Sequence, residues 1–174
     1  MKSIIPSKEE CFYILEMLES SLIDFSYTHP WADRIIGLID IPPSWLCDVS
    51  TKKYTGDQKK AFREYVFSEP FEETPVDIDK FHVGCLWIRY ERRELSWASF
   101  LQLSGEYLDA AGGDWDCETP YHYLNTIEDA YFSYESEERT KALYLKDHDV
   151  LPWANLAKQK LEPFLETRMT NKAG

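Results

Sequence analysis

The side chains that most often carry chemistry are few in this chain of 174 residues, and they lie far apart. The histidines are His29, His82, His122 and His148, and none belongs to an H-E-x-x-H motif or to a cysteine–histidine metal spacing. Only residues 147–149 (DHD) gather potential metal ligands closely, and a loop that caps a helix is the better interpretation of them. We therefore expect no metal site and no cofactor.

Neighbouring carboxylates also fail to make a catalytic pair. Glu128 with Asp129, and Glu137 with Glu138, are adjacent in sequence, and adjacent residues of a helix do not face each other. No G-x-S-x-G motif occurs, Cys47 has no basic neighbour to activate it, and phosphate-binding glycine motifs are absent. We predict that the chain is not an enzyme. An enzyme whose site is assembled from distant residues stays an alternative.

The acidic residues carry the most information about function. The chain has a net charge of −12. Residues 94–138 contain eleven acids and no lysine or arginine, and residues 64–79 add six acids, again without a base. Such charge repels nucleic acid and anionic lipid, and it speeds encounter with cationic surfaces. We expect a basic protein partner and no direct binding to nucleic acid or membrane, unless the acids serve only solubility.

Aromatic side chains stand among these acids, as they do at the energetic centre of many protein interfaces. Trp115 lies in residues 112–118 (GGDWDCE), a turn in which a large ring has no helix face to join. We predict this turn as an interaction site with Trp115 as its anchor. The predicted partner-binding residues are Asp114, Trp115, Asp116, Glu118, Glu135, Glu137 and Glu138.

Helix signals dominate the chain, whereas the alternation typical of strands is almost absent. Ser7-x-x-Glu10 is a capping box that predicts a helix over about residues 8–22. Proline and polar caps predict further helix starts. The predicted starts lie near Lys8, Trp31, Trp45, Asp57, Asp79, Ser96, Thr119 and Pro152. We expect an all-α fold, a bundle of about seven helices.

Length and composition favour a single acidic helical domain over residues 1–174, with a frayed tail at residues 168–174. Hydrophobic residues make up 44% of the chain, which is enough for a core without disulfides. We expect the four scattered cysteines to be reduced and mostly buried. The first residues hold no apolar stretch long enough for a signal peptide or a membrane span, so the expected location is cytoplasmic.

Residues 31–36 (WADRII) and 40–50 (DIPPSWLCDVS) are similar to a pattern in uncharacterised bacterial proteins encoded beside toxin genes. With its size, its acidity and its lack of catalytic motifs, the chain resembles the immunity proteins of bacterial polymorphic-toxin and contact-dependent growth inhibition systems. The resemblance implies a one-to-one complex in which the chain covers the active-site cleft of a basic toxin domain, such as an RNase or a DNase. An adaptor or scaffold for another basic protein is the alternative.

Overall fold

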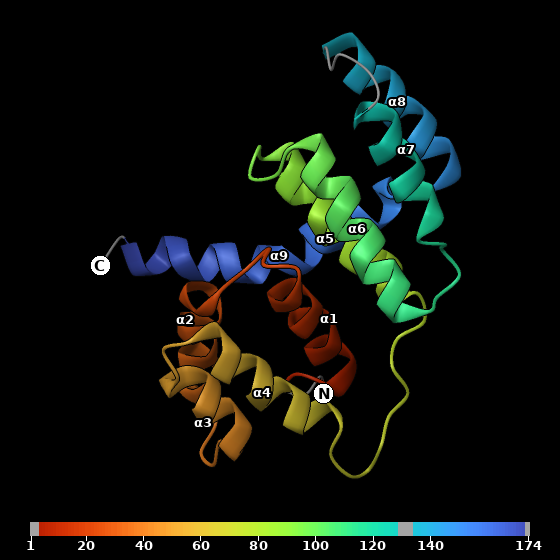
Figure 1. Ribbon diagram of the computed structural model, residues 1–174. Coiled ribbons are helices and arrows are strands. Elements are labelled where there is room, and N and C mark those ends of the chain that lie inside the picture. Colours follow the sequence, from red (N-terminus) through yellow and green to blue (C-terminus); the bar gives the residue numbers. More distant parts are fainter. Residues whose placement is uncertain (1–3, 129–133, 173–174) are drawn as a thin grey trace. The chain divides into compact units, whose positions relative to one another are not determined.

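A computed structural model of the protein describes residues 4–128 and 134–172. Over these residues the chain forms helices and no strand (Figure 1). In chain order they are α1 (Lys8–Glu19), α2 (Phe25–Ile36), α3 (Ser44–Thr51), α4 (Thr55–Val66), α5 (Ile78–Glu91), α6 (Trp97–Ala111), α7 (Glu118–Glu128), α8 (Tyr134–Asp147) and α9 (Leu151–Lys172). The prediction of an all-α fold is confirmed for the described part of the chain. None of these helices is both long and apolar enough to cross a membrane.

The helices gather in two compact units. Unit 1 consists of residues 1–76 and 158–174, and unit 2 of residues 77–157. Unit 1 therefore holds α1 to α4 with most of α9, while unit 2 holds α5 to α8 with the first residues of α9. That the whole chain forms a single domain stays a prediction.

Short polar side chains mark where several helices begin. At α1, the Ser7 hydroxyl accepts the amide of Glu10 at 3.2 Å, and the Ser7 amide donates to the Glu10 carboxylate at 3.0 Å. This is the predicted capping box. At α6, the Ser96 hydroxyl accepts the amide of Ser99 at 3.0 Å. These bonds satisfy amides that the first turn of a helix leaves without an internal partner.

The start of α2 differs from the prediction. Asp24 accepts the amide of Ser26 at 2.8 Å, and the helix begins at Phe25. Pro30, expected in the first turn of a helix, lies inside α2 instead. The carboxylate cap at Asp24, six residues before Pro30, accepts a free amide at the true start of the helix, and the proline signal alone did not reveal it.

The described residues contain nine helices rather than about seven. The helix for which no start was predicted is α8, whose sequence YESEERTKALYLKD shows little apolar periodicity. Tyr144 of α8 is fully buried. Packing within unit 2 therefore stabilises this helix, although its apolar spacing does not predict it.

The C-terminal part of α9 also differs from the prediction. A frayed tail was expected at residues 168–174, but residues 168–172 continue the helix; residues 173–174 lie outside the described residues. Thr167 is buried, and the guanidinium carbon of Arg168 lies 4.1 Å from the centroid of the Tyr27 ring. A cation–π contact and a buried side chain hold this last stretch against α2.

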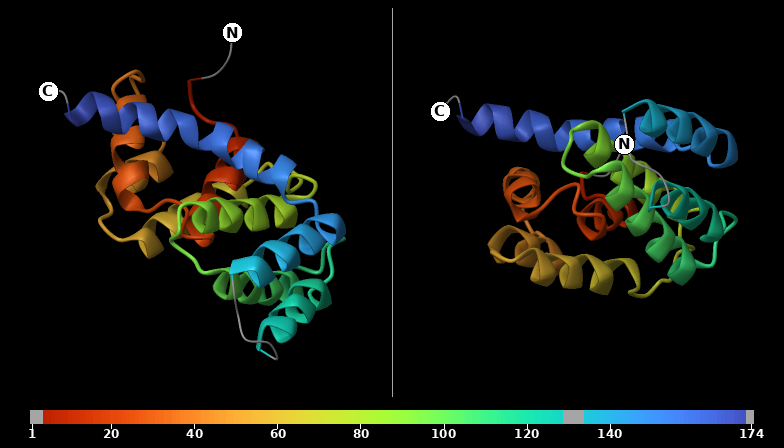
Figure 2. Two further views of the ribbon diagram at one scale, coloured as in Figure 1. Left: turned by 90° about the horizontal axis from the view of Figure 1, so that it is seen from above. Right: turned by 45° about the horizontal axis from the view of Figure 1, so that its top comes forward.

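An aromatic cluster forms the centre of unit 1. Trp31 packs against Phe62 and Phe164, with ring centroids 6.1 and 5.3 Å apart. Trp45 packs against Phe62 and stacks on Tyr65, at centroid distances of 5.8 and 4.3 Å. These rings join α2, α3, α4 and the C-terminal part of α9. Figure 2 shows α2 beside α3 within this unit.

A second aromatic cluster forms the centre of unit 2. Trp97, the first residue of α6, packs against Trp87 of α5, Phe100 of α6 and Tyr144 of α8. The centroid distances are 6.2, 5.3 and 5.6 Å, respectively. The indole N–H of Trp97 donates to the hydroxyl of Thr140 at 3.1 Å. The cluster therefore sets how α5, α6 and α8 pack together.

The four cysteines are free, as expected. Cys11 and Cys85 are buried, whereas Cys47 and Cys117 are partly exposed. Burial, assisted by the nearby Glu10 carboxylate, raises the pKa of the Cys11 thiol far above its ordinary value. Cys11 is thus an inert part of the core.

Two glycines of helices allow a direct test of close packing. A Cβ on Gly84 of α5 would lie 2.6 Å from the carbonyl carbon of Trp153, which is backbone and cannot rotate away. We expect Gly84→Ala to lower the free energy of unfolding by about 1–3 kcal/mol. Gly56 of α4 has no atom within 4 Å of such a Cβ. Gly56→Ala should raise that free energy by up to about 1 kcal/mol, because alanine favours helix.

Urea denaturation of both variants measures these changes. If Gly84→Ala proved as harmless as Gly56→Ala, the close approach of α5 to the first turn of α9 would be contradicted.

Candidate functional site

Unit 2 carries most of the net negative charge of the chain. Its residues 77–157 include sixteen acids and seven lysines or arginines, whereas unit 1 has fifteen acids and twelve such bases. All of the predicted partner-binding residues belong to unit 2. We therefore place the candidate site on this unit.

The structure divides the predicted residues into two groups at the two ends of α7. Asp114, Trp115, Asp116 and Glu118 lie in or next to the loop before α7, and the other three lie near the start of α8. The eleven residues of α7 span about 16 Å. The end of α8 lies at the loop before α7, since the Tyr123 hydroxyl donates to Asp147 at 2.5 Å and the next residue, His148, stacks on Trp115. The start of α8 is thus distant from the loop, as Figure 1 also shows.

The loop before α7 is held by hydrogen bonds. Gly112 ends α6 in the left-handed conformation, with φ of 65°, which favours glycine. The Asp116 carboxylate accepts the amide and the hydroxyl of Thr119, at 2.6 and 3.1 Å. Burial opposes ionisation of Asp116, but these bonds and the nearby His148 outweigh it and lower the pKa of its carboxyl. The side chain of Asp114 is 83% exposed and lies 3.4 Å from the Lys80 ammonium.

Trp115 is held by its own unit. Its ring stacks on the imidazole of His148, with centroids 4.6 Å apart and planes 4° from parallel. The Lys80 ammonium lies 5.9 Å from the centroid of the same indole. Trp115 is consequently only partly exposed. Its predicted role as an anchor for a partner stays a prediction, and only the uncovered part of the ring is open to contact.

The predicted acids at α8 line a second feature, which we call the aromatic–acid pocket. Glu137 and Glu138 share it with Trp87 and Tyr90 of α5 and with Trp97 of α6. Its volume is about 940 Å³, near the upper end of the range for ligand sites. Glu135 is exposed in the first turn of α8. Glu91, Arg93 and Lys141 also line the pocket, so its described residues include three carboxylates and two cations.

The Lys141 ammonium lies among the polar groups and an aromatic ring of the aromatic–acid pocket. The Tyr90 hydroxyl donates to Glu137 at 2.6 Å. Lys141 forms an ion pair with Glu138, and its ammonium lies 5.7 Å from the centroid of the Tyr90 ring. Carboxylates and the face of an aromatic ring both attract cations. The indole N–H of Trp87 is buried and has no hydrogen-bond partner among the described residues.

Sequence reasoning did not assign the aromatic walls of this pocket to a site. The starts predicted near Asp79 and Ser96 belong to the helices that carry Tyr90 and Trp97, but they gave no neighbour for either ring. Their meeting with Glu137 and Glu138 depends on α8, which the apolar pattern did not reveal. The acidic run itself was the available signal for the carboxylate half of the pocket.

The compact DHD segment carries no metal-ligand cluster. Among the described residues, no group of three or more histidine, cysteine or acidic side chains could hold a metal ion. His148 is buried between Trp115 and Tyr144, with the nearest carboxylate oxygen of Asp116 at 3.6 Å from its Nε2.

Burial, together with the hydrogen bond to Asp147, raises the pKa of Tyr123 to about 12.

Comparisons with known proteins give no relative. No protein-family model matches the chain, and neither the curated proteins nor the solved structures provide a significant match.

His148 makes the stability of unit 2 depend on pH. Burial lowers its pKa below the ordinary value of 6.5, although Asp116 and Asp147 oppose the shift. The unfolded chain then takes up this proton at a higher pH than the folded protein does. Stability is therefore complete above about pH 6.5 and declines as the pH falls below it, by at most about 1.4 kcal/mol per pH unit.

His148→Gln removes this contribution. We expect the stability difference between wild type and variant to be larger at about pH 8 than at about pH 5.5. Urea denaturation at both values measures it, and the pair at about pH 8 controls for the lost stacking on Trp115. Parallel stability curves for the two proteins would show that His148 is not the responsible group.

Proposed function

We propose that unit 2 binds a cationic segment of another protein and that the chain acts as an immunity protein. Its partner would be a basic toxin domain of RNase or DNase type, held one-to-one with its active-site cleft covered. In this proposal the protein works in the cytoplasm and catalyses no reaction of its own.

The placement of Lys141 supports this proposal most directly. Its ammonium lies over the Tyr90 ring and pairs with Glu138, beside the Glu137 carboxylate. A lysine or arginine from a partner would find the same combination of ring face and carboxylate, in a pocket of about 940 Å³. Nuclease domains need cationic side chains to hold phosphate, so their clefts present the matching groups.

The excess of acids in unit 2 supports the proposal through long-range attraction. Asp114, Glu118 and Glu135 are exposed and need little desolvation to meet a basic surface. A surface with such charge increases the rate of encounter with a cationic protein, and added salt reduces the effect.

A pull-down tests the proposed function. The tagged protein is co-expressed with the products of its native neighbouring genes and washed at low and then at high salt, with mass spectrometry of what remains. A retained basic protein that is toxic when expressed alone is the expected result. Recovery of an acidic or harmless partner, or of none, would overturn the immunity proposal.

The α8 carboxylates provide a sharper test with that partner. Glu137→Gln combined with Glu138→Gln removes two charges but keeps an acceptor for the Tyr90 hydroxyl. At low salt we expect the double variant to associate with the partner about tenfold more slowly than the wild type does. High salt should reduce this difference in association rate. Stopped-flow or surface plasmon resonance measures the rate.

Glu162→Gln combined with Glu166→Gln is the matched control, because both residues are exposed on the part of α9 that belongs to unit 1. If both double variants slowed association equally, net charge alone would account for the effect and the aromatic–acid pocket would have no special role.

The variant Trp115→Ala distinguishes a role of this ring in partner binding from a role in stability alone. Trp115→Ala should weaken binding to the partner by about 2 kcal/mol if its exposed part is an interface hot spot. It should also lower the melting temperature, because the stack on His148 is lost. Calorimetry of binding and of unfolding measures both effects; a lower melting temperature with unchanged affinity would remove Trp115 from the interface.

A further inference from the structure

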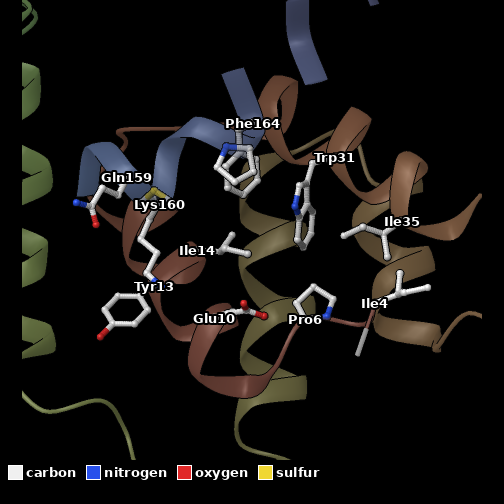
Figure 3. Close-up of a pocket in the computed structure, with 12 residues that line it drawn as sticks. Ile4, Pro6, Glu10, Tyr13, Ile14, Trp31, Ile35, Gln159, Lys160 and Phe164 are labelled. Atoms are coloured by element: carbon white, nitrogen blue, oxygen red, sulfur yellow. The ribbon is translucent and has the colours of Figure 1, made fainter. Parts of the chain in front are cut away.

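Unit 1 contains a pocket of about 420 Å³, formed by α1, α2 and the part of α9 within this unit (Figure 3). Its apolar walls include Ile14, Met17, Trp31, Ile35 and Phe164. The volume is typical of small-molecule sites, and most of the lining residues are of apolar type. None of these residues belongs to the proposed partner-binding surface of unit 2.

Three polar lining residues gather at one end of this pocket, and the Glu10 carboxylate lies between the two ends. Figure 3 shows Lys160, Gln159 and Tyr13 on one side and Ile4 and Ile35 on the other. A molecule that fills the pocket would therefore meet polar groups at one end and hydrocarbon at the other.

Lys160 supplies a cation at the polar end. Its ammonium lies 4.6 Å from the centroid of the Tyr13 ring, and it forms no ion pair with a carboxylate of the described residues. By contrast, Lys59 and Lys141 each have a carboxylate partner. An ammonium without a carboxylate beside an apolar pocket attracts an anionic group more strongly than it would in open water.

The pocket also contains one carboxylate, that of Glu10. It accepts the Ser7 amide at 3.0 Å and completes the cap of α1. This bond holds one Glu10 oxygen at the start of its own helix, and Glu10 forms no ion pair with the Lys160 ammonium.

We propose that this pocket binds a small amphipathic carboxylate of the medium-chain fatty acid class. Its carboxylate pairs with the Lys160 ammonium and accepts from the Gln159 amide, while its hydrocarbon chain packs on Trp31, Ile35 and Phe164. This binding activity is additional to the proposed role of unit 2 and does not depend on it.

Octanoate and octan-1-ol are matched probes, because they share a hydrocarbon chain and differ in charge. Titration of the full chain by calorimetry and by two-dimensional NMR should show saturable octanoate binding at one site, with shifts of the Trp31 indole signal. We expect octanoate to bind about tenfold more tightly than octan-1-ol. Lys160→Gln should abolish this preference and leave octan-1-ol binding unchanged.

Two further variants complete the design. Lys158→Gln removes the same charge two residues away, at a position that does not line the pocket, and should keep the preference for octanoate. Ile35→Asp places a charge in the apolar wall at a partly exposed position and should abolish binding of both probes. Circular dichroism and the melting temperature establish that each variant is folded.

Several results would overturn the proposal. They are absence of saturable octanoate binding, equal binding of the two probes by the wild type, or an unchanged preference in Lys160→Gln. Concentration-dependent dimerisation that Ile35→Asp abolishes, without octanoate binding, would instead assign the pocket to a second copy of the chain.

Discussion

The packing of aromatic rings around Trp97 is the constraint on which the rest of unit 2 depends. Rings of this size bury much apolar area, and few orientations of the Trp97 ring also satisfy its indole N–H. The Trp97 indole N–H has its partner in Thr140 of α8. This one bond, with the contacts to Trp87 and Tyr144, sets the separation and the rotation of α8 against α5 and α6. The carboxylates of α8 come to lie beside Tyr90 as a result.

Charge next to such a cluster must be balanced locally. Carboxylates close to apolar rings are less screened than in water, and a buried one without a partner destabilises the fold. Glu137 accepts from Tyr90, and Glu138 pairs with Lys141. These pairs account for how the fold tolerates acids at the aromatic walls. They also identify the chemistry that the pocket offers to an outside cation.

Much of the fold was predictable because the signals are local. The capping box at Ser7 and the cap at Ser96 act within one helical turn, and both were correctly predicted. The start of α2 at Asp24 and the existence of α8 were missed. Of the candidate site, the acids were evident from composition, but the neighbours of those acids were not. Trp115 illustrates this: the loop around it was evident, whereas its stack on His148 joins residues far apart in the chain.

The sequence by itself determined a helical fold, a strongly acidic surface and the lack of a recognisable catalytic motif. Helix caps and apolar spacing depend on residues within a few positions of one another, and net charge depends on composition alone. The amino-acid sequence is therefore sufficient to predict them. Only the tertiary structure decided which acids share a surface. It separated the Trp115 loop from Glu137 and Glu138, and it brought Tyr90 and Trp97 to the latter pair. The physical reason is that side chains of different helices meet through long-range packing, which local propensities leave undetermined.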